Sequence, residues 1–281
     1  MKANRPLELI LKKSEVIMNY WTQSEKNIFV AAHRGWRSRY PENTLEAFRA
    51  ALALGVDQIE TDIRITKDGE LVLIHDETVD RTTNGSGRVS EMTFAELRAL
   101  DAGIKKDECF AGANVPTLTE LMELVKDHPT MTLDLELKEY PTEGREAIAY
   151  EVCDRVLAIV DRYGFTDRVV INSFSGKLNE YVYRKYGKKY RQHVYFPLEA
   201  LGICTLDPYS YAYCTCMFGS PYMAKKEAFD RMRAYGVQPW AGASVKDAKG
   251  VENAIANGAV LITCDNPDEI LALLRERGYH K

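Results

Sequence analysis

Residues 57–65 read DQIETDIRI, and residues 132–138 read TLDLELK. In both stretches apolar side chains alternate with polar or charged ones, which is the period of a β-strand whose two faces meet different surroundings. Glu60, Asp62 and Glu136 lie on the charged faces. A surface strand with one solvated face would show the same alternation. The helical segments between the strands favour a barrel, because helices then cover the apolar faces and the charged faces line the interior.

Strand-like and helix-like segments alternate over most of the chain. Thr117 and Glu120 form a capping box before an apolar helix, and Asn266 with Pro267 opens another. At the first helix, Asn43 is the predicted N-cap. Further strands are expected near residues 28–32, 71–75, 168–172, 191–195, 212–217, 237–241 and 259–263, and helices near 145–162, 175–185, 221–235 and 246–256. Repeated βα units require a parallel sheet, and about eight of them predict a TIM (β/α)8 barrel, an α/β fold.

The alternation is interrupted once, by turn-rich sequence at about residues 76–116. We expect this segment to be a small insertion after the second barrel strand that lies over the mouth of the barrel. Residues 28–281 are predicted to form one domain. Residues 1–27 are interpreted as an N-terminal extension, either a short surface helix or sequence upstream of a start at Met18.

Composition and charge exclude several classes of protein. The net charge is −4, so no overall positive field attracts nucleic acid. The six cysteines are scattered, which indicates free thiols in a reducing compartment, and Cys214 and Cys216 lack the spacing of a zinc site. No apolar run approaches the ~18 residues that cross a bilayer, and the charged N-terminus does not resemble a signal peptide. We expect a cytoplasmic protein without stable membrane insertion.

Two histidines and three carboxylates form the candidate catalytic set. Glu60, Asp62 and Glu136 in one concavity would repel one another, and a divalent cation removes that conflict. His33 and His75, with ordinary pKa values near ~6.5, are suited to exchange protons at neutral pH. Such a set fits metal-assisted phosphoester cleavage. The alternative is a carboxylate cluster that pairs with arginines at the rim, namely Arg37, Arg39 or Arg64.

Two basic residues are candidates for binding the phosphate. Arg34 offers a planar fork of donors and Lys138 a point charge. Each has a structural alternative: an ion pair for Arg34, and for Lys138 a role as counter-ion to Asp134. Asp76 is expected to orient the neighbouring histidine or its loop rather than to bind metal. The remaining histidines, at positions 128, 193 and 280, have no comparable context and are interpreted as structural.

Several motifs occur together in a characteristic order and spacing. They are His33-Arg34-Gly35, Pro41-Glu42-Asn43-Thr44, Glu60-Thr61-Asp62, Thr66-Lys67-Asp68-Gly69, His75-Asp76 and Glu136-Leu137-Lys138. In these motifs the chain resembles the glycerophosphodiester phosphodiesterase family, densely from about residue 29 to 138 and loosely beyond. The resemblance implies a TIM barrel with a small insertion after the second strand. It also implies hydrolysis of deacylated phospholipids, such as glycerophosphocholine, to sn-glycerol 3-phosphate and an alcohol, with Ca²⁺ or Mg²⁺ as the cofactor.

The resemblance weakens in the second half of the chain. A strand that often reads Trp-Thr-Val-Asn in the family corresponds to residues 240–243, which keep Trp240 but not the asparagine. Trp240 is a candidate to pack over the glycerol or the headgroup, or is an ordinary barrel aromatic. Residues 201–223 match nothing in the family, which leaves the choice of substrate open.

Several further questions stay open at this point. A related barrel lyase acting on lysophospholipids or phosphoinositides would use the same chemistry, with an apolar rim for which Tyr209, Tyr211 and Tyr213 are weak candidates. A barrel that binds without catalysis is the alternative from another class. The pattern does not distinguish which of His33 and His75 is the base, nor whether water or a substrate hydroxyl attacks. It makes no prediction of oligomeric state.

Overall fold

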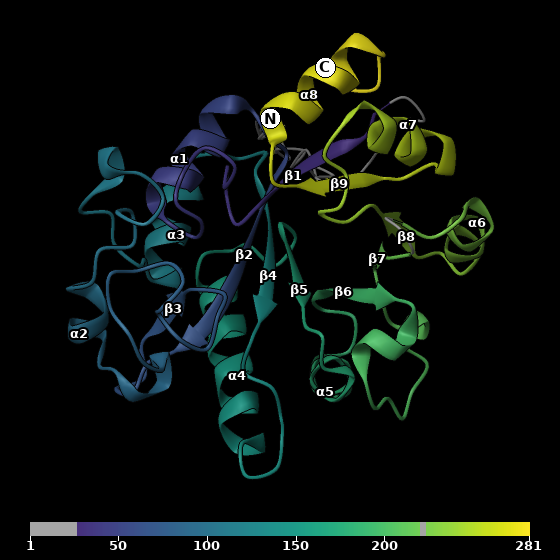
Figure 1. Ribbon diagram of the computed structural model, residues 1–281. Coiled ribbons are helices and arrows are strands. Elements are labelled where there is room, and N and C mark those ends of the chain that lie inside the picture. Colours follow the sequence, from purple (N-terminus) through teal and green to yellow (C-terminus); the bar gives the residue numbers. More distant parts are fainter. Residues whose placement is uncertain (1–26, 220–222) are drawn as a thin grey trace, which may run out of the picture.

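The structure is a computed structural model that describes residues 27–219 and 223–281 (Figure 1). The expected N-terminal helix therefore lies outside the described residues. Within the described residues, eight of the nine strands form a parallel barrel in the order β8-β7-β6-β5-β4-β2-β1-β9. They are β1 (Phe29–His33), β2 (Gln58–Ile65), β4 (Thr132–Leu137), β5 (Val169–Asn172), β6 (Arg191–Phe196), β7 (Cys214–Met217), β8 (Gln238–Trp240) and β9 (Leu261–Cys264).

The first and last strands in this order meet and close the barrel. The amide of Ala241, just after β8, donates to Leu261 O at 2.8 Å, and Thr263 N donates back to Ala241 O at 2.9 Å. Because the ring of strands is closed, residues from both ends of the chain reach one central cavity. The predicted TIM barrel is confirmed.

Helices surround the barrel (Figure 1). They are α1 (Leu45–Leu54), α3 (Leu118–Val125), α4 (Glu146–Arg162), α5 (Gly176–Tyr186), α6 (Lys226–Ala234), α7 (Ala248–Asn257) and α8 (Pro267–Glu276). Their apolar faces pack on the outward side chains of the strands, so that Phe48, Leu121, Ile59 and Leu133 belong to one buried core. The capping box predicted at Thr117 is present, with Glu120 as its partner, and the periodic segments correctly predicted the helices around it.

The start of α1 differs from the prediction. Thr44 is the N-cap, with its hydroxyl accepting from Ala47 N at 3.3 Å. Asn43, the predicted cap, has a φ of 55° and directs its side chain into the barrel instead. Both residue types cap helices, and the sequence pattern did not separate two adjacent candidates.

The segment predicted as a strand near 71–75 is not a barrel strand. β3 (Leu71–Leu73) pairs antiparallel with β2, and Ile63 lies opposite Leu73. β2 is long enough to extend past the barrel, and the turn after it sends the chain back along the same strand. This reversal returns the chain to the level of Asp62, where Ile74 N donates to Asp62 O at 3.1 Å.

The chain between β3 and α3 forms a small subdomain beside the mouth of the barrel. It contains a 3-10 turn at Val89–Glu91, the short helix α2 (Phe94–Arg98) and a second 3-10 turn at Glu108–Phe110. Its own apolar cluster includes Val79, Val89 and Leu97. Arg81 connects it to the loop after β1, because its guanidinium binds both carboxylate oxygens of Glu42.

Inside the barrel, apolar residues close the end opposite the mouth. Ala31, Val170, Cys214, Trp240 and Leu261 form this plug. All six cysteines lie in the described residues and are free thiols, as expected. Among the described helices, none is long and apolar enough to cross a membrane.

Candidate active site

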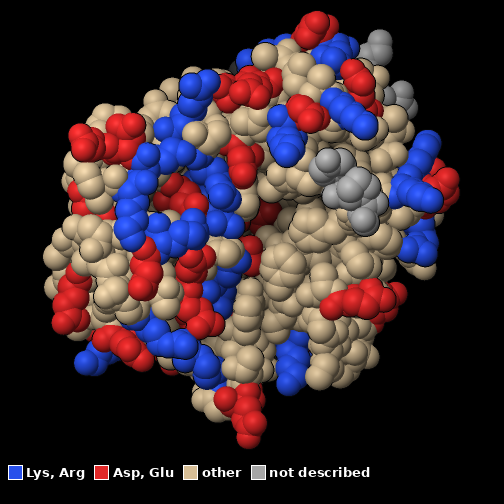
Figure 2. Space-filling view, viewed as in Figure 1, with Lys and Arg blue, Asp and Glu red and all other residues tan. Residues whose placement is uncertain are grey.

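A cavity of about 230 Å³ opens where the barrel strands end. Its lining comes from all eight barrel strands or the loops that follow them, together with His75 after β3: His33, Arg34, Glu60, His75, Asp134, Glu136, Lys138, Asn172, Phe174, His193, Tyr195, Cys216, Phe218, Gly242, Ala243 and Thr263. Figure 2 shows a hollow near the middle of the molecule with acidic side chains at its bottom. Most of the predicted site residues therefore meet in one place.

Three buried carboxylates form the acidic part of this cavity. Glu60 and Asp62 project from β2 and Glu136 from β4, and Asp62 pairs with Glu136 in the strand register. Ligand atoms of the three residues lie within 4.8 Å of one another. Parallel pairing thus places residues from distant parts of the sequence at one site, with the spacing that a small cation requires.

The three carboxyl groups do not all ionise easily. Burial, together with the charges of Asp62 and Glu136, raises the pKa of Glu60 well above its usual range. Burial also raises the pKa of Glu136 to about 7. Burial acts in the same direction on Asp62, but the positive charges of Lys138 and Arg34 outweigh it and hold the pKa of Asp62 below its ordinary value. Negative charge is therefore crowded here, which is the electrostatic condition of a cation site.

Lys138 partly neutralises this cluster. Its Nζ lies 2.5 Å from Glu136 Oε1 and 3.2 Å from Asp62 Oδ1. The contact with Asp134 that the sequence suggested as an alternative is not formed, because Asp134 binds His193 instead. Lys138 is held by the same carboxylates that could bind a cation, and it faces the cavity.

Each of the two candidate catalytic histidines is held by a carboxylate at Nδ1. His33 Nδ1 lies 2.6 Å from Asp265 Oδ1, and His75 Nδ1 lies 2.6 Å from Asp76 Oδ1. The role expected for Asp76 is therefore confirmed. Both imidazoles line the cavity, and His33 Nε2 lies 3.9 Å from Glu60. A carboxylate at Nδ1 fixes the ring and leaves Nε2 for chemistry.

The environment of His75 favours its neutral form. Burial lowers the pKa of His75, and the charges of Lys138 and Arg34 add to this, although Asp62 and Asp76 oppose it. The neutral imidazole has a free lone pair, which is the form that accepts a proton.

Arg34 occupies a strained position beside the carboxylates. Its φ is 59°, which is uncommon for a residue other than glycine. Its amide donates to Glu60 Oε2 at 2.9 Å, and its guanidinium contacts Glu42 at 2.8 Å and Asp62 at 3.3 Å. At Gly35 a Cβ would lie 2.8 Å from the Cβ of Ala47, so the turn tolerates only glycine. Strain at such a site indicates that the surrounding contacts hold Arg34 in place.

Trp240 lies deeper than predicted for a residue that touches substrate. It is buried in the apolar plug, and its ring centroid is 5.0 Å from that of His193. Its indole Nε1 donates to Gln238 at 3.2 Å. It lies beneath the cavity, next to residues that line it.

Two of the three tyrosines considered for a membrane-docking rim are not placed to form one, and the third, Tyr209, is half-buried. Tyr211 is buried, and Tyr213 precedes β7, at the end of the barrel opposite the mouth. The hydroxyl of Tyr213 accepts from Gln238 at 2.9 Å. The structural support for an enzyme that docks on membranes through these residues is therefore absent.

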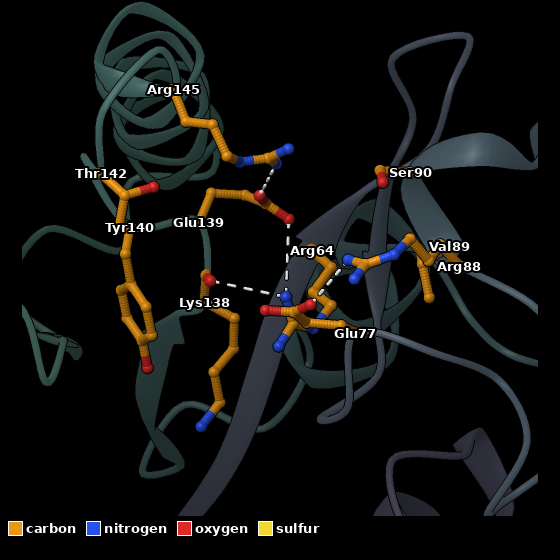
Figure 3. Close-up of a pocket in the computed structure, with 10 residues that line it drawn as sticks. All are labelled: Arg64, Glu77, Arg88, Val89, Ser90, Lys138, Glu139, Tyr140, Thr142 and Arg145. Carbon is orange, nitrogen blue, oxygen red and sulfur yellow. Dashed lines mark hydrogen bonds and ion pairs between the residues drawn. The ribbon is translucent and has the colours of Figure 1, made fainter.

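A second, smaller pocket of about 120 Å³ adjoins the backbone of Lys138 (Figure 3). Three arginines reach it, and all three form ion pairs: Arg88 with Glu77, and both Arg145 and Arg64 with Glu139. Arg64 is buried and donates from Nε to the carbonyl of His75 at 2.9 Å. Its Nη1 lies 3.5 Å from the carbonyl of Lys138. Arg64 thus connects the backbones of two residues of the active site.

Sequence reasoning missed several residues of the cavity region, among them two aspartates and a histidine. Asp265 follows the last barrel strand, and nothing local connects it to His33. Asp134 and His193, interpreted as a counter-ion and a structural histidine, form a buried pair at 2.7 Å and both line the cavity. Alternation placed Asp134 on the inner face, but only the closed barrel shows which histidine faces it.

Comparison with known proteins agrees with this geometry. Residues 33–198 match the model of the glycerophosphoryl diester phosphodiesterase family. The chain is 38% identical over 259 residues to a glycerophosphodiester phosphodiesterase from Caldanaerobacter subterraneus, which covers 89% of this chain and 98% of that protein. A glycerophosphodiester phosphodiesterase structure from Agrobacterium tumefaciens superposes with a TM-score of 0.69 at 27% identity, over 87% of this chain and 99% of that one. A phosphodiesterase structure from Oleispira antarctica gives a TM-score of 0.72 at 24% identity, over 88% and 96%.

The family match lies over the strands and loops that carry His33, Glu60, Asp62, His75 and Glu136, and the relative from Caldanaerobacter extends the similarity over nearly the whole chain. The chain is a phosphoric diester hydrolase, and it belongs to the glycerophosphodiester phosphodiesterase family.

Proposed function

We propose that the protein hydrolyses deacylated glycerophospholipids to sn-glycerol 3-phosphate and an alcohol, with a divalent cation and two histidines. The observation that supports this most is the carboxylate triad within 4.8 Å, in a cavity that two carboxylate-bound histidines also line. The related Oleispira structure is a complex with the product sn-glycerol-3-phosphate, which fits the same class of substrate.

The donor set fits Ca²⁺ or Mg²⁺. Glu60, Asp62 and Glu136 offer hard oxygen ligands, and the raised pKa values of Glu60 and Glu136 indicate an excess of negative charge that a cation would relieve. When bound, such a cation supplies charge stabilisation at a phosphate oxygen. Arg34 and Lys138 are proposed to bind further phosphate oxygens, since both line the cavity beside the triad. Trp240 is proposed to support this site from below rather than to contact substrate.

The two histidines are proposed to divide proton transfer between them. His75, with its lowered pKa, is the better proton acceptor for the attacking hydroxyl. His33 lies 2.6 Å from Asp265 through Nδ1 and 3.9 Å from Glu60 through Nε2, on the opposite side of the proton transfer from His75 in this proposal, and is the proposed donor to the leaving oxygen. The attacking hydroxyl is either water or a hydroxyl of the substrate glycerol.

Release of glycerol 3-phosphate tests this proposal directly. Protein treated with chelator would be assayed with glycerophosphocholine and glycerophosphoethanolamine before and after adding Ca²⁺ or Mg²⁺. We expect turnover that depends on the cation, and losses of about 10²-fold or more in His33→Gln, His75→Gln and Glu136→Gln. His128→Gln, at an exposed position, is the matched control. Cation binding without release of product would contradict the proposal, and lysophospholipids and cyclic phosphates would be the next substrates.

A further inference from the structure

A third histidine lies deeper in the cavity and has no role in the proton transfers described above. His193 is 4% exposed, and its Nδ1 lies 2.7 Å from Oδ2 of Asp134, which is fully buried. Among the described residues, His193 Nε2, Asp134 Oδ1 and Asn172 Oδ1 have no hydrogen-bond partner. All three side chains line the cavity. Buried polar atoms normally find a partner, so three together at the wall of a cavity indicate a place for a polar ligand group.

The strand register places this group at the inner end of the cavity. Asn172 pairs with His193 across β5 and β6. Phe174 and Tyr195 lie two residues further along the same strands, closer to the mouth, with their rings stacked at 3.7 Å. Asp134 pairs in register with Glu60 of the carboxylate triad. A ligand group that reaches His193 therefore passes the aromatic rings and lies beside the carboxylates.

The contact with Asp134 indicates whether a ligand group at His193 must donate or accept a hydrogen bond. Asp134 Oδ2 lies 2.7 Å from His193 Nδ1, and in the tautomer that donates from Nδ1 to this oxygen the lone pair of the ring is at Nε2. Asn172 adds a second acceptor through Oδ1. The ring of His193 lies between Trp240 at 5.0 Å and Tyr195 at 5.2 Å, measured between centroids, so its plane is held on two sides. The inner end of the cavity is thus rich in acceptors and matches a group that donates.

We infer that His193, oriented by Asp134, is a substrate-positioning residue that accepts a hydrogen bond from an O–H or N–H group of the glycerophosphodiester. The inference rests on the proposed function and adds which kind of substrate group is recognised. The C2 hydroxyl of the glycerol is next to the phosphate and is the substrate hydroxyl that could attack it. Two other parts of such a substrate carry the donor: the terminal hydroxyl of the glycerol, and the ammonium of an ethanolamine headgroup. The quaternary ammonium of choline has no N–H and does not qualify.

Two variants distinguish a role of His193 in substrate recognition from a purely structural role. In His193→Gln the side-chain amide extends to the position of Nε2, whereas in His193→Asn the amide lies at the position of Nδ1 and keeps a donor for Asp134. A positioning role predicts that Gln preserves more activity than Asn, and a structural role predicts the reverse. Thermal unfolding of both variants shows whether each one folds.

Three substrates identify the recognised group. They are glycerophosphoethanolamine, glycerophosphocholine, and the propane-1,2-diol analogue of glycerophosphoethanolamine, which lacks only the terminal hydroxyl. We expect His193→Asn to lower kcat/KM by roughly tenfold, mainly through KM, for substrates with the recognised donor. If the donor is the glycerol hydroxyl, the loss disappears with the propanediol analogue alone. If it is the ammonium, the loss disappears with glycerophosphocholine alone.

An equal loss with all three substrates, or better rescue by Asn than by Gln, would overturn the role of His193 while leaving the proposed function intact. Absence of turnover by the wild-type protein on every diester would overturn the proposed function, and the inference with it.

Discussion

Asn43 Nδ2 lies 2.9 Å from Asp62 Oδ2, and Asn43 Oδ1 accepts from the hydroxyl of Thr61 at 2.8 Å. One amide therefore binds two consecutive residues of β2 and fixes the carboxylate of Asp62, which lies at the centre of the triad. The left-handed backbone at Asn43, with φ at 55°, directs the side chain inward. Asparagine combines this backbone preference with a donor and an acceptor.

Two substitutions of Asn43 should separate the contribution of its backbone conformation from that of its side-chain hydrogen bonds. Asn43→Ala loses both hydrogen bonds and places a Cβ in left-handed geometry, so we expect a loss of about 1–3 kcal/mol in unfolding free energy. Asn43→Gly retains the backbone and should lose less stability, with a similar fall in kcat/KM. Urea unfolding and steady-state kinetics measure the two effects. Full activity in the glycine variant would show that Asp62 needs no support from Asn43.

The carboxylate of Asp265, which binds His33 at 2.6 Å and Arg37 at 3.6 Å, should affect catalysis through His33. Asp265→Asn keeps the shape but removes the charge and the strong acceptor at Nδ1, so we expect a loss of roughly 10–100-fold in kcat with little change in stability. Asp268→Asn is the matched control, because Asp268 pairs only loosely with Arg39, at 3.8 Å. Equal activity of the two variants would remove Asp265 from the catalytic arrangement.

Stability of the metal-free protein should fall as pH rises. The pKa of Glu136 is raised from 4.5 to about 7, so between these values the folded protein holds a proton that the unfolded chain has lost. Unfolding free energy therefore decreases through this window, and the raised pKa of Glu60 acts in the same direction. A divalent cation that displaces the proton should stabilise more at about pH 8 than at about pH 5.5.

Thermal unfolding with chelator or with Ca²⁺ or Mg²⁺, at both pH values, measures this effect. Glu136→Gln should flatten the pH dependence of the chelated protein, because the amide does not titrate. A midpoint that is independent of both cation and pH in the unmodified protein would argue against a cation at the triad.

Arg64 should affect catalysis without contacting substrate. Arg64→Lys removes the Nε donor from the carbonyl of His75 and weakens the contact with Lys138 O. We expect a loss of about 1–3 kcal/mol in stability and a lower kcat. Arg88→Lys, in the same pocket but exposed and paired with Glu77, should stay within about 0.5 kcal/mol. Equal losses of stability and kcat in the two variants would show that Arg64 does not stabilise the backbones of His75 and Lys138.

The local sequence pattern predicted most of the architecture, and most of the predicted site residues line one cavity. Alternation along residues 57–65 and 132–138 identified the two strands that carry the triad. Both faces of these strands are buried, but one packs against apolar helices and the other lines the polar cavity, and this difference imposes a period of two. The antiparallel pairing of β3 with β2 was not predicted, since a short apolar run does not reveal the direction of its partner strand. The pairs His33–Asp265 and Asp134–His193 span 232 and 59 residues, and no local periodicity encodes such contacts.

Barrel closure also sets when the active site can form during synthesis. β1, which ends at His33, pairs with β9, and Asp265 follows β9 directly. A nascent chain therefore exposes His33 to the cell long before its carboxylate partner leaves the ribosome. Hydrolytic activity should appear only after the last barrel strand has emerged, so products of early termination would bear the catalytic motifs and remain inert.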